Sequence, residues 1–200
     1  MKKATTGVTE KLLAAAEKEF LQYGFTNASL RRISADCGVS TNSIYTRFHD
    51  KADLFNAIVK PAADGLLDIY LSAVKSAENS NDVSTAEQHG IRGTDCVLEY
   101  IYENFNAFKL IFCCSAGTEY EHFFDKLSEI EASYYRTFAD KYSRSGERLS
   151  DFFIHVVCAS GWQYMYEIVS HGLSFEEARE FMLSIGKFNY AGWESVLGVK

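Results

Sequence analysis

The sequence predicts an all-α protein in which a small N-terminal helical domain precedes a larger helical domain. Only one proline occurs among the 200 residues, and proline interrupts helices. Apolar residues recur at intervals of three and four rather than in the strict alternation that marks strands. The apolar fraction of 47% is ample for a buried core, yet no apolar run is long enough to span a bilayer. We therefore expect a cytoplasmic protein without a membrane segment.

The first predicted helix covers residues 8–23, and Gly24 follows it as a C-terminal stop. Its buried face consists of the apolar residues at helical spacing, Leu12, Leu13, Ala16, Phe20 and Leu21. Ser29 can cap the start of a second, short helix. Gly38 closes that helix where a tight turn needs a positive φ.

Two more helices are predicted after this turn. Ser40 can cap a helix over residues 41–48, in which Ile44 and Phe48 share one buried face. Asp50 opens a long fourth helix, and Asp53 makes a capping-box-like pair with it. Pro61 lies inside this helix and should kink it or mark a join. We place the domain boundary there, which gives domains over residues 1–60 and 61–200.

The remainder of the chain is predicted to hold a second set of helices. The polar stretch 78–82 and the glycines at 90 and 93 predict a loop. Helix starts are expected at Thr118 with Glu121, at Ser150, and at Ser174 with Glu177. Helix stops are expected at Gly117, Gly146, Gly172 and Gly198.

Charge is distributed unevenly between the two domains. The whole chain has a net charge of −7, but residues 1–60 hold nine Lys/Arg and six Asp/Glu. The remainder holds 11 Lys/Arg and 21 Asp/Glu. A basic head on an acidic body is typical of a module that meets nucleic-acid phosphates.

Two short helices joined by a turn at Gly38 form a helix-turn-helix, in which the second helix enters the major groove of DNA. Small Ser34 allows the two helices to approach. The outward side of residues 41–48 carries short or basic hydrogen-bonding side chains, namely Thr41, Asn42, Ser43, Thr46 and Arg47. Side chains of these types read base edges in the groove.

These residues resemble the signature of the TetR family over residues 8–60. The resemblance is carried by Phe20, Gly24-Phe25, Ser29, Ile33, Gly38-Val39-Ser40, Ile44-Tyr45, Phe48 and Lys51-x-Asp53-Leu54-Phe55. It implies phosphate contacts for Ser29, Tyr45 and Lys51. It implies base contacts for the recognition positions, which are Thr41, Asn42, Ser43 and Thr46. Arg47 could contact either a base or the DNA backbone. Ser40 is included in the DNA-binding set. Ser34 and Cys37 replace the usual alanines, and both are small.

The body resembles the family only in its layout, a helical ligand-binding and dimerisation domain. It is rich in aromatic residues, because 22 of the 29 in the chain lie between Tyr100 and Trp193. Packing explains most of them, but some could line a pocket for an apolar or aromatic effector. The candidates are Phe105, Phe108, Phe112, Tyr134, Tyr135 and Phe138.

The last two predicted helices have broad apolar faces that one domain does not easily bury. In the family, the corresponding pair meets its twofold mate as a four-helix bundle, so we expect a homodimer. The predicted interface residues are Phe153, Val157, Gly161, Met165, Ile168, Met182, Ile185 and Trp193. A core within one chain is the alternative for about half of these residues.

No cofactor, metal site or catalytic centre is expected. The five histidines lack metal-ligand spacing, and no nucleophile motif accompanies them. The five cysteines lack paired spacing, which favours reduced and mostly buried thiols. Adjacent Cys113 and Cys114 could instead sense redox state or heavy metals. Glu103 and Glu167 could meet a cationic ligand or lie on solvated faces.

The sequence therefore predicts a dimeric transcriptional regulator that binds palindromic operator DNA. Repression with release by a small-molecule effector is the family default, and the residues alone do not distinguish it from activation. The alternative is a helical ligand-binding protein or enzyme whose head does not bind DNA. That alternative does not explain why the outward side of residues 41–47 is polar.

Overall fold

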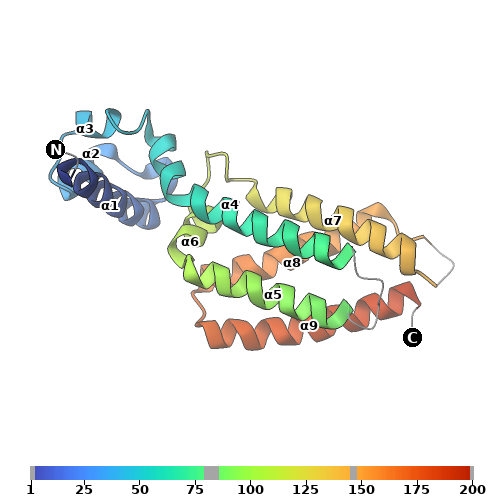
Figure 1. Cartoon of the computed structure of the whole chain (residues 1–200). Helices are drawn as coiled ribbons and strands as arrows, with labels where there is room; N and C mark the ends of the chain where they lie inside the picture. The colour runs from blue at the N-terminus through green and yellow to red at the C-terminus, as the bar shows by residue number, and fades with distance from the viewer. Residues whose placement is uncertain (1–2, 79–85, 145–147, 199–200) are drawn as a thin grey trace. The chain divides into compact units, whose positions relative to one another are not determined.

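The computed structural model describes residues 3–78, 86–144 and 148–198, and all regular secondary structure in these ranges is α-helical (Figure 1). The helices are α1 (Lys3–Asn27), α2 (Leu30–Asp36), α3 (Thr41–Tyr45), α4 (Lys51–Glu78), α5 (Ala86–Glu103), α6 (Phe105–Cys113), α7 (Phe123–Tyr142), α8 (Asp151–His171) and α9 (Phe175–Leu197). The predicted all-α class is confirmed. No described helix is long and apolar enough to cross a membrane.

The chain divides into two compact units. The first unit takes in the described chain up to Gly65 together with Asn104–Glu121, and the second takes in Leu66–Glu103 and the described chain from His122 onward. Helix α4 continues through Pro61, which neither ends the helix nor separates the units. The compact units divide between Gly65 and Leu66 rather than at Pro61, and the functional domains over residues 1–60 and 61–200 stay a prediction.

The core of the first unit forms where α1, α2, α3 and α4 present apolar faces. Its fully buried side chains include Leu12, Phe20, Ile33, Ile44, Leu54 and Phe55. The rings of Phe20 and Phe25 both contact Phe55, at centroid distances of 5.1 and 5.5 Å. Gly24 has a φ of 70° and interrupts α1 before its last residues, which agrees with the stop predicted there.

Residues 104–121 join the first unit through contacts that sequence spacing does not reveal. The backbone N–H of Phe25 donates to the Cys114 carbonyl at 2.9 Å, and Thr26 Oγ1 donates to the Ala116 carbonyl at 3.0 Å. Helix α6 also packs against α1. The pair Thr118 and Glu121 was predicted to start a helix, but it closes a turn instead. The reason is that the Glu121 carboxylate accepts from the N–H of Gly117 at 2.9 Å, and α7 begins only at Phe123.

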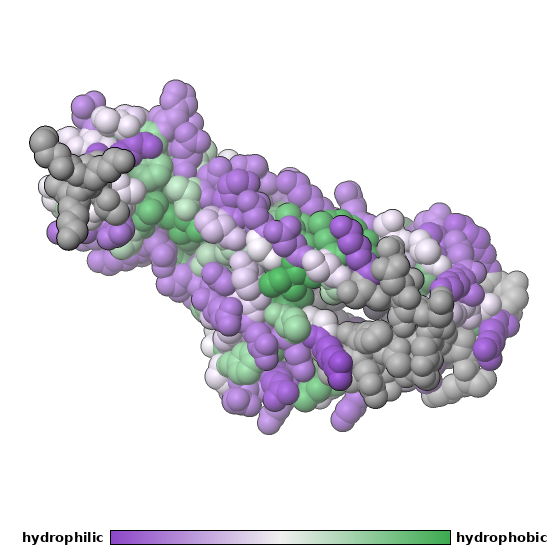
Figure 2. All heavy atoms as spheres, in the orientation of Figure 1, coloured by the Kyte–Doolittle hydropathy of each residue, from purple (hydrophilic) through white to green (hydrophobic). Residues whose placement is uncertain are grey.

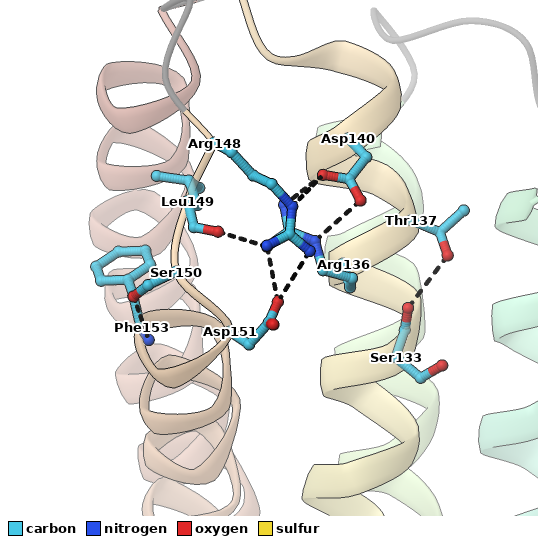
Figure 3. A network of polar contacts seen from close by, with 9 residues as sticks. All are labelled: Ser133, Arg136, Thr137, Asp140, Arg148, Leu149, Ser150, Asp151 and Phe153. Carbon is cyan, nitrogen blue, oxygen red and sulfur yellow. Dashed lines mark hydrogen bonds and ion pairs between the residues drawn. The ribbon is translucent and has the colours of Figure 1, made fainter.

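In the second unit, α7 lies alongside α8 and α5 lies alongside α9 (Figure 1). Arg136 on α7 fixes the start of α8 (Figure 3). It donates to Asp140 at 2.6 Å, to the Leu149 carbonyl at 2.5 Å and to Asp151 at 3.1 Å. These bonds satisfy a carbonyl just before the helix and place a cation beside the acidic first turn of α8.

Most predicted caps of the second unit are confirmed. The side chains of Ser150 and Ser174 accept from backbone N–H groups at the starts of α8 and α9, and Ser174 completes a capping box with Glu177. Gly172 and Gly198 cap the ends of these helices in the left-handed conformation. The predicted stop at Gly146 lies outside the described residues.

Two other predictions for the body are wrong. The glycines at 90 and 93 lie within α5 rather than in a loop, since helix formation tolerates isolated glycines when the rest of the segment packs. The cysteines are free but not mostly buried. Only Cys158 is buried, whereas Cys96 and Cys113 occupy exposed positions on their helices.

Candidate nucleic-acid interface

Helices α2 and α3 form a helix-turn-helix whose turn depends on Gly38. This glycine has a φ of 68°, a conformation that other residues rarely adopt. The turn is closed by a hydrogen bond from the N–H of Val39 to the carbonyl of Ser34 at 3.0 Å. Ser34 is itself buried, and its hydroxyl donates to the Arg31 carbonyl at 2.9 Å. The small side chain of Ser34 therefore lies at the point where the turn contacts α2.

Helix α3 starts as predicted but ends earlier. The Ser40 hydroxyl accepts from the N–H of Ser43 at 3.2 Å, which confirms Ser40 as the N-cap. The predicted helix extended to Phe48, whereas the observed helix ends at Tyr45. Phe48 still donates to the Ile44 carbonyl at 2.8 Å, so residues 46–48 continue as a hydrogen-bonded turn. A terminal turn of this kind commonly shifts a helix boundary.

The outward face of α3 is polar and accessible. Asn42, Tyr45 and Thr46 are exposed, and Tyr45 keeps 56% of its surface accessible. Ile44, which faces the opposite way, is fully buried. The side-chain amide of Asn42 makes no hydrogen bond to any residue that the structure describes. Its donor and acceptor are thus free to meet a ligand.

The remaining predicted recognition residues are held more closely. Thr41 and Ser43 are half-buried, and Ser43 Oγ lies 3.1 Å from Ser40 Oγ. Arg47 is also half-buried, because its guanidinium donates to Thr9 Oγ1 at 3.3 Å and to the Ser43 carbonyl at 3.0 Å. These contacts tie the end of the recognition segment to α1.

Lys51, to which the resemblance assigns a phosphate contact, makes internal contacts in this structure. Its ammonium donates to the carbonyls of Phe25, Thr26 and Ala28 at 2.7, 3.1 and 3.2 Å. It also lies 4.6 Å from the centre of the Phe25 ring. Burial lowers the pKa of this group. An ammonium has three N–H donors, and all three are engaged in joining the start of α4 to the end of α1.

Ser29 lies at the N-cap of α2, but its side chain makes no capping hydrogen bond. The N–H of Ser29 instead donates to Glu19 Oε1 at 2.8 Å, and Arg32 Nε donates to the same oxygen at 2.8 Å. Burial alone would raise the pKa of Glu19, but the bonds from Arg32 and Ser29 lower it below its ordinary value of 4.5. The sequence analysis did not predict this structural role of Glu19. The signal for it was a carboxylate next to Phe20 on the apolar face of the first helix.

The six predicted pocket residues are divided between the units. Phe105, Phe108 and Phe112 lie on α6 in the first unit, where Phe108 is fully buried. Tyr134, Tyr135 and Phe138 lie together on α7 in the second unit, with ring centroids 5.4 to 6.3 Å apart. The contacts described within each unit therefore form two aromatic groups.

The predicted interface residues are also of two kinds. Met165 and Ile168 are buried inside the chain, at 6% and 1% exposure. The others, Phe153, Val157, Gly161, Met182, Ile185 and Trp193, keep partial exposure. Two residues outside the predicted set are far more accessible, Phe152 at 77% and Phe188 at 71%. The face in Figure 2 is mostly hydrophilic with smaller apolar areas.

Residues 12–58 match the family profile described as bacterial regulatory proteins, tetR family. Over 79 residues, the chain is 34% identical to the HTH-type transcriptional repressor BepR of Brucella suis biovar 1 (strain 1330). The aligned segment is 40% of this chain and 37% of that relative. The chain therefore spans little more than a third of the length of this curated relative.

Solved structures resemble nearly the whole chain in fold. A putative TetR-family transcriptional regulator from Syntrophomonas wolfei str. Goettingen superposes with a TM-score of 0.60 at 20% identity, covering 91% of this chain and 94% of that one. A gamma-butyrolactone receptor (an ArpA-like protein) superposes with a TM-score of 0.57 at 17% identity, covering 92% and 96%. At these identities the similarity establishes the fold.

Replacing Lys51 by methionine should destabilise the first unit, since three carbonyls lose their donor while the side-chain stem remains. We expect the free energy of unfolding to fall by about 1–3 kcal/mol in urea titrations followed by circular dichroism. Lys60→Met, at an exposed position on the same helix, is the matched control and should change little. If Lys51→Met kept its stability and only flattened the salt dependence of DNA binding, Lys51 would be a phosphate ligand.

Glu19→Gln should destabilise the protein in a pH-dependent way. The lowered pKa means that the folded state holds fewer protons than the unfolded state, so the stabilisation is complete above about pH 4.5 and is lost as pH falls through the lowered pKa. The unfolding free energies of wild type and variant should therefore converge at acid pH. Glu10→Gln, exposed on the same helix, is the control. A gap that stays constant down to acid unfolding would exclude an ionised Glu19.

Proposed function

We propose that this chain is a member of the tetR family of bacterial regulatory proteins, whose family profile matches residues 12–58, and that it binds operator DNA as a transcriptional repressor. The match falls within residues 8–60, where the sequence resembles the same family. The observation that carries the proposal is the accessible polar face of α3 on a helix-turn-helix whose turn and cap are both hydrogen-bonded. A head that served only for packing would have no need of that face.

In this proposal α3 enters the major groove. Asn42 and Thr46 are the most accessible candidates for base contacts, with Thr41 and Ser43 beside them. The hydroxyl of Tyr45 contacts the DNA backbone phosphates. At the edges of the surface, Ser29 contacts a phosphate and Arg47 contacts a base or the backbone. Lys51 acts by positioning this surface, since its donors are engaged within the first unit.

Two copies of the chain would bind the two halves of a palindromic operator. The accessible apolar side chains on α8 and α9 support a dimer built from these helices, with Phe152, Val156 and Phe188 nearest its centre. Met165 and Ile168 support the same helices from within each chain. A twofold axis through this contact matches the symmetry of the DNA site.

A small molecule bound in the second unit would release the repressor from DNA in the cytoplasm. This step requires a protein conformation that binds the effector well and DNA poorly. Effector and operator must then weaken each other by the same factor. The helical body and its aromatic groups support an effector with apolar surface.

Asn42→Ala should reduce sequence preference more than affinity for DNA in general. The amide can both donate and accept at a base edge, so its loss should cost about 1–3 kcal/mol per half-site on the operator. Binding to a scrambled duplex should hardly change. The measurement is fluorescence anisotropy at several salt concentrations, with the DNA upstream of the chain's own coding region as the operator.

Gln22→Ala on α1 is the matched control for this experiment, since Gln22 is an exposed amide in the same unit outside the proposed surface. It should leave both duplexes unaffected. Equal weakening of both duplexes by Asn42→Ala would remove this residue from base reading. Failure of the wild type to bind either duplex at low salt would reject the proposed function itself.

Phe152→Glu should convert the proposed dimer into a monomer. A carboxylate in an apolar contact must be desolvated without a partner, whereas it is harmless on a monomer surface. Light scattering coupled to size exclusion measures the change, and operator binding should weaken with it. Leu71→Glu, at an exposed apolar position of α4, should remain dimeric. A dimeric Phe152→Glu protein would place the interface elsewhere.

A further inference from the structure

Two cysteines lie next to each other at the end of α6, in the first unit. Cys113 is the last residue of this helix, and Cys114 is its C-cap. Cys113 is exposed, Cys114 is half-buried, and both thiols are free. Neither sulfur makes a hydrogen bond to a described residue, whereas Cys37 Sγ donates to the Ile33 carbonyl at 3.1 Å. The pair therefore offers two S–H groups that are available to a ligand.

The backbone at this point allows both sulfurs to reach one ligand atom. Consecutive side chains of an α-helix point about 100° apart, which would keep the two sulfurs on different sides. Cys114 leaves the helical conformation, with a φ of −127° and a ψ of 4°, so this fixed separation does not apply to the pair. The two groups are also close enough for a charge on Cys114 to raise the pKa of Cys113.

The number and the protonation of these donors decide which ligand fits. Among the described residues, no group of three or more His, Cys, Asp or Glu side chains could hold a metal ion, whereas zinc needs about four protein ligands. Burial raises the pKa of both thiols, although the nearby Lys109 ammonium partly offsets the rise. A protonated thiol is a poor nucleophile toward an oxidant. The ligand is therefore a soft centre that needs two sulfurs and removes the thiol protons itself.

We propose that Cys113 and Cys114 form a dithiol site for trivalent arsenic compounds. Phenylarsine oxide, the probe, carries two As–OH groups when it is hydrated in water. Each thiol replaces one hydroxide, so two As–O and two S–H bonds break while two As–S bonds form. The thiol protons leave with the hydroxides as two water molecules. Arsenic stays trivalent, and the step therefore needs no oxidant or reductant. The product is a closed ring in which arsenic bridges the two sulfurs.

Closing this ring should also act on α1. The ring restricts ψ of Cys113 and φ of Cys114, the two torsions that flank their shared peptide bond. The Cys114 carbonyl comes directly after this restricted bond, and it accepts from the N–H of Phe25 at 2.9 Å. Two residues later, the Ala116 carbonyl accepts from Thr26 Oγ1 at 3.0 Å. Phe25 and Thr26 lie at the end of α1, where the chain leads into α2. A bound arsenical should therefore loosen this connection.

The site is tested by titrating the reduced full chain, without DNA, with phenylarsine oxide. Intact-mass spectrometry should show one arsenical per chain, with the loss of two titratable thiols. Ethanedithiol should remove the arsenical, whereas mercaptoethanol should not. Cys113→Ser and Cys114→Ser should each weaken uptake by about a hundredfold or more, since the second As–S bond forms at a high effective concentration. Cys96→Ser, which removes an exposed solitary thiol on α5, is the control and should bind like the wild type.

Two results would overturn the dithiol site: uptake by Cys113→Ser with the affinity of the wild type, or release of the arsenical from the wild type by mercaptoethanol alone. Thermal melts keep the comparison interpretable. Cys113→Ser changes an exposed side chain by one atom, so it should melt like the wild type.

Hydrogen exchange tests the connection to α1. The amide of Phe25 should exchange faster in the arsenical-loaded wild type, and it should not change when Cys113→Ser is treated in the same way. Unchanged exchange in the loaded wild type would overturn the coupling. The effect on DNA rests on the proposed function, and loading should weaken operator binding by about tenfold. Failure of the unloaded protein to bind the operator would reject the repressor without rejecting the dithiol site.

Discussion

The first unit depends on satisfying the polar backbone between α1 and α2. The chain turns sharply at Gly24, and the following peptide groups cannot all bond within a helix. Lys51 binds three of their carbonyls, Glu19 accepts from the N–H of Ser29, and the Cys114 carbonyl accepts from Phe25. These partners come from α4, α1 and the segment after α6. One junction therefore fixes α2, and through α2 it fixes α3.

This arrangement explains why the charged and the uncharged polar side chains in the head serve different purposes. Glu19, Arg32 and Lys51 are occupied by internal hydrogen bonds, so they hold the helix-turn-helix in shape. Asn42 and Tyr45 are held by the backbone of α3 alone, and their side chains remain accessible. A rigid frame with an accessible polar face loses little conformational entropy when it meets a ligand.

The second unit contains two buried or half-buried charged groups in different surroundings: Arg136, whose charge is paired, and Glu131, which has no described counter-charge. Arg136 has two carboxylates and a carbonyl within hydrogen-bonding distance, and it stabilises the start of α8 (Figure 3). Glu131, one turn or so earlier on the same helix, has no described counter-charge and is destabilised by burial. The two groups on one helix therefore differ in how their charge is compensated.

The sequence by itself determined the features that arise from neighbouring residues. The all-α class, the caps at Ser40, Ser150 and Ser174, and the exposed polar face of α3 all follow from local propensity, hydrogen bonding and periodicity. Only the tertiary structure decided the inward role of Lys51, the inclusion of residues 104–121 in the first unit, and the burial of Glu131. These features depend on partners far apart in the chain. Periodicity indicates which face of a helix is buried, but it does not indicate which residues will cover that face.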